Sequence, residues 1–304
     1  MLRFLCMFFL VWGGLIGSAW SATVNVVTTT TDLAAIARAV GGKDVAVRSL
    51  TSGASDPHYL AAKPSMIRAI YEADLLLLNG AELESGWLPA AVQAGRNPRV
   101  QPGRPGYLDL SEAVRLLKVP EGPITRAMGD VHPSGNPHYM LDPRNGARVA
   151  TAVAERLKAI DPTHADAYQA RLETFLDALN RRFADWRDRL AFLQGRKAIS
   201  YHKSLSYLAD AFGFEIVDQV EPLPGISPTV SHLQGLIARI QAEQIGLLVM
   251  EAFYERRSSD FLNKQTGIRA VVLPTMVGAT PGIETYFDLF EAIVDALKES
   301  GGKT

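Results

Sequence analysis

Cysteine is almost absent from this chain of 304 residues, because Cys6 is the only one. A framework of disulfides is therefore excluded, and so is a zinc site built from several cysteine thiolates. Any site for a transition metal must take its ligands from histidine, aspartate and glutamate.

Clustered charge and long apolar runs are also lacking. The 31 lysine and arginine residues and the 32 aspartate and glutamate residues are spread along the chain and leave a net charge of −1. This pattern argues against a nucleic-acid partner, which would need a clustered basic face. Beyond Ser21, no apolar stretch approaches the roughly 20 residues of a membrane-spanning helix.

The first 21 residues are typical of a secretory signal peptide. Arg3 precedes an apolar run from Phe4 to Trp12, and small residues follow up to Ala19-Trp20-Ser21. The run is short for the alternative, a membrane anchor, and glycines interrupt it. We expect cleavage after Ser21 and a mature protein that is free in the periplasm, because Cys6 lies too early to become a lipid-modified first residue.

The order of the predicted elements indicates an α/β protein with two similar lobes. Val24–Thr28 is strand-like, Asp32–Val40 is an amphipathic helix closed by two glycines, and Val45–Leu50 is a second strand, so a parallel sheet is expected. Lys197–Val220 repeats this strand, helix, strand pattern. Further elements are predicted at helix 65–72, strand 75–78, helix 230–241, strand 245–250, helix 258–265, strand 270–273 and helix 286–297.

Between the lobes, apolar residues recur every three or four positions from Leu172 to Leu193, which predicts one helix over about 162–193. At 1.5 Å per residue such a helix is about 45 Å long and can run the length of a two-lobed body. We expect it to pack on its own lobes; a coiled-coil arm is the alternative. The predicted organisation is a signal peptide (1–21), a first lobe (22–161), a linking helix (162–194) and a second lobe (195–304).

Three of the six histidines follow strands or occupy turns, where α/β sheets place ligands. His58 lies in Asp-Pro-His-Tyr and His138 in Asn-Pro-His-Tyr, so a stiff proline turn presents each ring, and the acid or amide two residues earlier can orient it. His202 follows the first strand of the second lobe and can face the other two across a cleft. Three neutral imidazoles suit Zn(II), whereas Mn(II) would want more carboxylate oxygens.

These residues carry a family resemblance. The two proline-histidine turns, the Tyr-His before a helix in the second lobe and the long central helix together resemble the zinc and manganese substrate-binding proteins of ABC importers, over nearly the whole mature chain. The resemblance implies two α/β lobes with central parallel sheets, joined by one rigid helix, and a metal in the cleft between them. It also implies His58 and His138 as ligands from the first lobe, His202 from the second, and a permease in the inner membrane as partner.

Two departures from that family matter. Its members commonly supply an aspartate after the last strand, where this chain reads Leu-Pro-Thr-Met-Val-Gly from Leu273. Glu251 is the nearest replacement, either as a ligand or as a group beside the ligands. The alternative is that Glu251 forms an ion pair with Arg256 or Arg257. Water is another candidate for the fourth ligand of the metal.

The second departure is that no histidine-rich tract is present, and His132 stands alone in the corresponding region. We expect His132 to stabilise its loop or lie in solvent, with metal loading as the alternative. His164 and His232 are expected to be surface or helix-capping residues.

Two other functions remain open from the sequence. A zinc hydrolase also uses three histidines and an open position, but the chain has no His-Glu-x-x-His helix and no convincing Gly-x-Ser-x-Gly turn, so we expect no enzyme. A binding protein for a metal chelate or another organic ligand would use aromatic groups, and Tyr59, Tyr139 and Tyr201 adjoin the three histidines. We expect a monomer, with a periplasmic metallochaperone as a candidate second partner.

Overall fold

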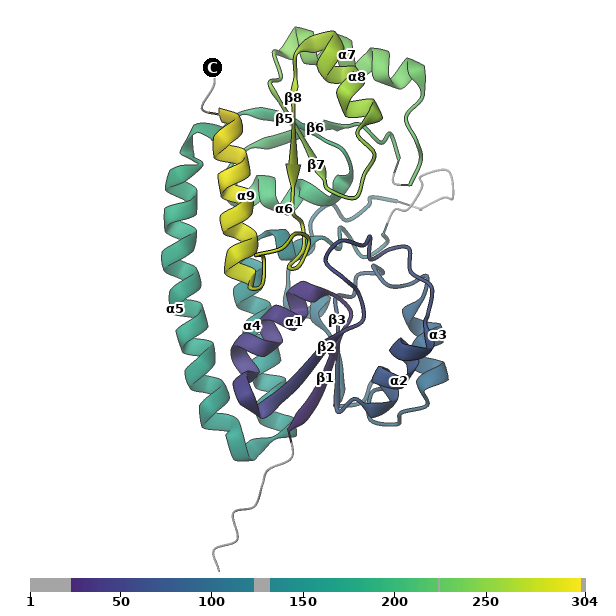
Figure 1. The fold of residues 1–304 in the computed structure, drawn as a ribbon, viewed down its shortest axis with the longest axis vertical. Coiled ribbons are helices and arrows are strands. Elements are labelled where there is room, and N and C mark those ends of the chain that lie inside the picture. Colours follow the sequence, from purple (N-terminus) through teal and green to yellow (C-terminus); the bar gives the residue numbers. More distant parts are fainter. Residues whose placement is uncertain (1–22, 123–131, 224, 302–304) are drawn as a thin grey trace, which may run out of the picture.

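The computed structural model describes residues 23–122, 132–223 and 225–301. The predicted signal peptide lies outside the described residues. The chain forms two four-stranded, fully parallel sheets, one in each lobe, with strand orders β2-β1-β3-β4 and β6-β5-β7-β8 (Figure 1). The two orders correspond strand for strand, which confirms the expected pair of similar α/β lobes.

The first lobe begins with β1 and ends with α4. Its elements are β1 (Val24–Thr28), α1 (Thr31–Gly41), β2 (Val45–Ser49), α2 (Pro64–Glu72), β3 (Leu75–Leu78), α3 (Leu88–Gly95), β4 (Tyr107–Asp109), the 3-10 helix η4 (Tyr139–Leu141) and α4 (Pro143–Ile160).

The second lobe contains the remaining strands. Its elements are β5 (Lys197–Ser200), α6 (Ser206–Phe212), β6 (Glu215–Gln219), α7 (Val230–Glu243), β7 (Leu247–Glu251), α8 (Arg257–Thr266) and β8 (Arg269–Leu273), followed by the C-terminal α9 (Tyr286–Gly301). Among the helices of the described residues, none is both long and apolar enough to cross a membrane.

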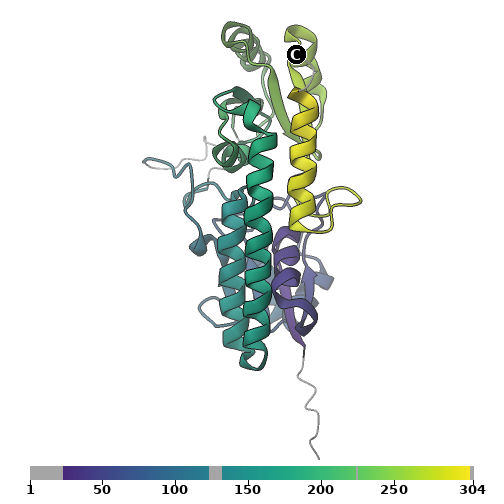
Figure 2. The same cartoon turned by 90° about the vertical axis from the view of Figure 1, so that its left-hand side faces the viewer.

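The linking helix is shorter than predicted. A 3-10 turn occupies Pro162–His164, α5 runs from Ala165 to Arg189, and a second 3-10 turn follows at Ala191–Leu193. The 25 residues of α5 give a length of about 37 Å. The helix does not form an isolated arm, because α1, α4 and α9 pack along it (Figure 2).

One hydrophobic core joins the two lobes. In β3, Leu75 and Leu77 enter the core that α1, α4 and α5 cover, whereas Leu76 and Leu78 enter a separate core under α2 and α3. The first of these cores continues along α5 and α9 to strands β5, β7 and β8 of the second lobe. Both sheets are therefore fixed to the same helical layer.

This arrangement decides where a ligand can bind. In each sheet the strand order reverses beside the first strand of the lobe, between β1 and β3 and between β5 and β7. Open parallel sheets bind ligands at the carboxyl ends of their strands next to such a reversal. Residues that follow these strands in both lobes meet between the sheets, as the cavity linings described below show.

Candidate metal centre

The three predicted histidines come together between the lobes. His58 lies in the loop after β2, and His138 directly precedes η4. His202 is the second residue after the end of β5. One nitrogen from each ring can be chosen so that all three atoms lie within 4.8 Å of one another. The ring centroids of His58 and His138 are 5.1 Å apart, and His202 lies 5.8 Å and 5.4 Å from these two.

Each of these rings has an oxygen partner on its Nδ1 atom. Asp56 Oδ1 lies 2.7 Å from the Nδ1 of His58, and Asn136 Oδ1 lies 2.9 Å from that of His138. Glu221 Oε2 lies 2.7 Å from the Nδ1 of His202. Since the second nitrogen of a metal-bound histidine is usually engaged in this way, the three Nε2 atoms are left for a cation.

The two proline turns share one local geometry. The backbone N–H of His58 donates to Asp56 Oδ1 and that of His138 to Asn136 Oδ1, both over 2.9 Å. One side-chain oxygen thus holds both the backbone and the ring of the histidine two residues later, as Asx turns do. This explains why the sequence repeats an acid or amide, a proline and a histidine.

Buried side chains fix both turns to the first lobe. The indole N–H of Trp87 donates to the carbonyl of Pro57 over 3.0 Å, and the amide of Asn79 donates to the carbonyl of Pro137 over 2.9 Å. The hydroxyl of Tyr139 donates to the carbonyl of Asn79 over 2.6 Å. The imidazoles are therefore positioned before any ligand arrives.

The electrostatics of the site differ from ring to ring. Burial, followed by the charge of neighbouring histidines, holds the pKa of His138 well below its ordinary value of 6.5. Burial alone would also lower the pKa of His202, but the hydrogen bond to Glu221 and the charge of Glu251 raise it overall. Protons therefore compete with an incoming cation more strongly at His202 than at His138.

Glu251 is the last residue of β7 and is fully buried. It lines the same cavity of about 50 Å³ as the three histidines, although it does not belong to the group of atoms within 4.8 Å. Ser204 donates to Glu251 Oε1, whereas Oε2 has no hydrogen-bond partner among the described residues. Burial raises the pKa of this carboxyl group.

The alternative expectation for Glu251, an ion pair with Arg256 or Arg257, is wrong for the described residues. Arg256 faces Asp260 instead, with Nε 3.6 Å from Oδ1.

Of the two expectations for His132, the one that places it in solvent is also wrong. Instead of lying in solvent, its ring contacts the site, with Nε2 3.3 Å from Nε2 of His58. Burial, followed by the charge of the neighbouring histidines, lowers the pKa of His132 to about 4. Nothing in the sequence indicated this contact, because His132 lies six residues before His138 but contacts the turn of His58, which is 74 residues away in the chain.

Sequence reasoning also missed Glu221, whose only signal is an acid that closely follows a strand of the second lobe. The remaining histidines do not join the cluster. His164 pairs with Asp161 over 2.7 Å, and His232 Nε2 lies 2.9 Å from the carbonyl of Gln219.

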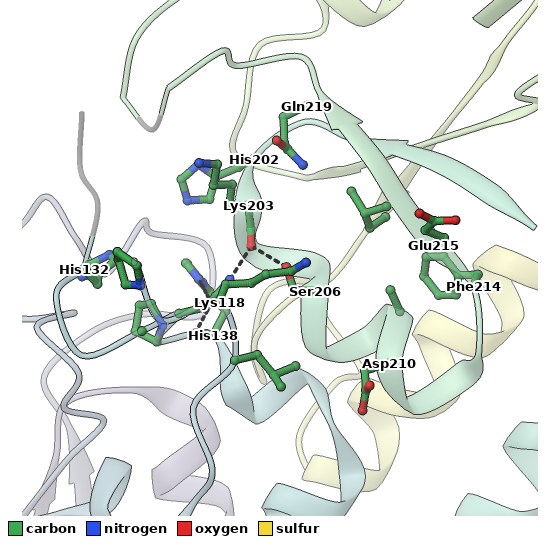
Figure 3. Close-up of a pocket in the computed structure, with 17 residues that line it drawn as sticks. Lys118, His132, His138, His202, Lys203, Ser206, Asp210, Phe214, Glu215 and Gln219 are labelled. Atoms are coloured by element: carbon green, nitrogen blue, oxygen red, sulfur yellow. Dashed lines mark hydrogen bonds between the residues drawn. The ribbon is translucent and has the colours of Figure 1, made fainter. Parts of the chain in front are cut away.

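A larger open cavity of about 770 Å³ adjoins the histidines. Figure 3 shows the rings of His132, His138 and His202 on one side of it, with Phe214 and Glu215 on the other. The tyrosines considered for an organic ligand are not found among the described residues that line either cavity. Tyr59 is exposed, and Tyr201 stacks on Tyr254 with centroids 4.6 Å apart.

Known proteins are similar to this chain in sequence and in fold. Iron-binding protein YfeA of Yersinia pestis is 25% identical over 288 residues, which cover 92% of this chain and 86% of YfeA. Manganese ABC transporter substrate-binding lipoprotein PsaA of Streptococcus mitis is 23% identical over 256 residues, which cover 81% and 77%. A crystal structure of ZnuA matches the fold with a TM-score of 0.77 at 23% identity, over 91% of this chain and 99% of that one.

The family model described as zinc-uptake complex component A, periplasmic (ZnuA), matches residues 26–300. Its members are substrate-binding proteins of transport systems and not enzymes, which removes the zinc hydrolase alternative. With this match over nearly all of the described residues, the chain belongs to the ZnuA family of metal-binding proteins that serve ABC importers.

Proposed function

We propose that this protein captures Zn(II) between its lobes with His58, His138 and His202 and delivers it to the permease of an ABC importer. The observation that carries the proposal is the convergence of three imidazoles whose ligand atoms lie within 4.8 Å of one another. The Nδ1 atom of each ring is hydrogen-bonded to a side-chain oxygen, which leaves each Nε2 available for a metal.

The donor atoms favour zinc over the other metals of the family. Relatives are named for iron and for manganese, so membership in the family leaves the metal open. Imidazole nitrogens suit Zn(II), while Mn(II) prefers carboxylate and water oxygens. The buried carboxylate of Glu251 lines the same cavity but lies outside the group of ligand atoms, which leaves a nitrogen-rich site. Mn(II) is the second choice, and Glu251 lies beside the ligands or joins them.

The proposal includes the setting in which the protein works. The N-terminal 21 residues direct export and are removed, and the mature protein acts in the periplasm as a monomer. Its lobes comprise residues 22–161 and 195–304, with 162–194 as the link. The permease works with an ATPase, as in other ABC importers, and a metallochaperone is a further candidate partner for loading.

Calorimetric titration of the metal-free protein with zinc and with manganese tests the proposal. We expect one zinc ion per chain, and His58→Ala, His138→Ala and His202→Ala should each weaken zinc binding by more than about tenfold, because each removes a ligand. His164→Ala is the matched control, since His164 pairs with Asp161 outside the cluster, and its affinity should equal that of the wild type.

Equal zinc affinity in all four variants would remove the proposed site. Tighter binding of manganese than of zinc would keep the site and change its metal.

A further inference from the structure

The distance between His132 and His58 is the starting point. Their Nε2 atoms are 3.3 Å apart, and the ring centroids are separated by 5.3 Å. In a tetrahedral zinc site each nitrogen lies about 2.0–2.1 Å from the ion, so two ligand nitrogens are about 3.3–3.4 Å apart. The observed pair has the spacing of two ligands of one zinc ion and is long for a hydrogen bond.

The turn that carries His132 is built into the first lobe. The N–H of Gly135 donates to the carbonyl of His132 over 3.1 Å, which closes the turn. Glu82 holds it from outside, because the hydroxyl of Ser134 donates to Oε1 over 2.6 Å and its N–H donates to Oε2 over 3.2 Å. The turn therefore keeps His132 beside His58 through contacts that are independent of the ring.

Gly135 strengthens this constraint. Its φ of +120° is a backbone conformation that side chains rarely adopt. A Cβ atom there would lie 2.9 Å from Leu116 Cβ and 3.0 Å from the carbonyl oxygen of Leu117. The turn and the segment at Leu116 and Leu117 thus fit together only through glycine.

The fourth coordination position has two candidate donors. The stretch from Leu273 to Gly278, of which Thr275 and Met276 line the cavity, contains no carboxylate. Glu251 lines the cavity, where Ser204 donates to its Oε1 and its Oε2 has no hydrogen-bond partner among the described residues. Neither Glu251 nor His132 belongs to the group of atoms within 4.8 Å. His132 offers a nitrogen at ligand spacing from His58.

We propose that His132 is the fourth ligand, so that zinc is bound by four imidazole nitrogens, three from the first lobe and one from the second. This inference rests on the proposed function and completes its site. Glu251 then lies beside the site and balances the charge of the cation without binding it.

The test combines zinc titration with X-ray absorption at the zinc edge on the exported, full-length mature protein. The wild type should show four imidazole ligands. In His132→Ala the count should fall to three, with an oxygen in the fourth place, and zinc affinity should fall about tenfold or more. Glu251→Gln should keep four imidazoles, and His232→Ala, which removes a histidine outside the cluster, should match the wild type.

Glu82→Ala provides a second, independent variant, because it leaves every ligand in place and removes only the anchor of the turn. We expect it to weaken zinc binding less than His132→Ala does, with four imidazoles retained at saturation.

The proposal is overturned if the wild type shows three imidazoles and His132→Ala binds zinc as tightly as the wild type. Loss of an oxygen ligand in Glu251→Gln would then identify Glu251 as the fourth ligand. These outcomes differ from a failure of the proposed function, in which His202→Ala would bind like the wild type or zinc would not bind at all.

Discussion

At the scale of single residues, the site depends on the oxygens that orient the imidazoles. Asp56 and Asn136 precede their histidines by two positions, so a local turn suffices to make each pair. Glu221 is 19 residues away from His202 and reaches it only because β5 and β6 are neighbours in the sheet. Asp56 and Asn136 can therefore be recognised from short sequence motifs, whereas Glu221 cannot.

The buried side chain of Asp32 predicts how the stability of the protein depends on pH. Its carboxylate accepts the N–H of Val277 over 2.7 Å, and burial raises its pKa from 3.8 to about 7. Between pH 4 and pH 7 the folded state keeps a proton that the unfolded state has released. The stability that this proton provides is complete below pH 4 and is lost as the pH rises to 7.

Asp32→Asn keeps an acceptor for Val277 but cannot ionise. Relative to this variant, the free energy of unfolding of the metal-free wild type should fall by about 1.4 kcal/mol for each pH unit between pH 4 and 7 and level off above. Urea denaturation of both proteins across this range measures the difference, in which other titrating groups such as Glu84 cancel. A difference that does not change with pH would contradict the prediction.

At the scale of elements, helix α5 links the lobes by packing rather than by stiffness alone. Trp186 is fully buried, and its indole N–H donates to Glu291 of α9 over 2.7 Å. The ring of Trp186 also stacks on Phe290, with centroids 5.3 Å apart. The C-terminal helix is therefore fastened to α5 by both apolar and polar contacts.

Two helical glycines give a matched pair of substitutions. A Cβ atom on Gly146 of α4 would lie 2.7 Å from Cζ of Tyr286, whereas one on Gly235 of α7 would meet no atom within 4 Å. Alanine is the better helix former, so Gly235→Ala should stabilise the protein by about 0.5–1 kcal/mol. Gly146→Ala should destabilise it by about 1–3 kcal/mol, because the buried Tyr286 cannot move without losing its bond to Met140.

Thermal or urea unfolding of the two variants measures both effects. If Gly146→Ala stabilised the protein as well, helix propensity, and not the contact between α4 and α9, would decide the result at Gly146.

At the scale of the whole molecule, the lobes contact each other on both sides of the site. Gly53 of the first lobe fits directly against the backbone of Val277 and Ala279, where a Cβ atom would overlap. On the other side, the amide of Asn136 donates to the carbonyl of Lys203 over 2.6 Å. The histidines thus lie between two bridges that join the lobes.

The shared core predicts how the protein unfolds. Buried residues of both sheets, α5 and α9 form one continuous cluster, so neither lobe can lose its packing without exposing the other. We expect a single cooperative transition of the metal-free protein in scanning calorimetry, with equal calorimetric and van't Hoff enthalpies. Two resolved transitions would show that the lobes are independent folding units.

The sequence by itself determined the α/β class, the two similar lobes and the positions of His58, His138 and His202. These features come from local periodicity and from short turns, which depend on neighbours in the chain. It did not reveal α3, β4 or the 18 residues of α4, although Asp142 caps α4 and Pro143 occupies its first turn, which are recognisable start signals.

Only the tertiary structure decided which side chains meet between the lobes. His132 faces His58 across 74 positions of the chain, Glu221 reaches His202 across a strand pair, and Glu251 turns to Ser204 instead of to the arginines that follow it. Each of these contacts depends on strand order and on the packing of loops against a common core. Neither is expressed in the spacing of residues along the chain. These three contacts could therefore be found only in the folded protein, unlike those of Asp56 and Asn136, which stand two residues before their histidines.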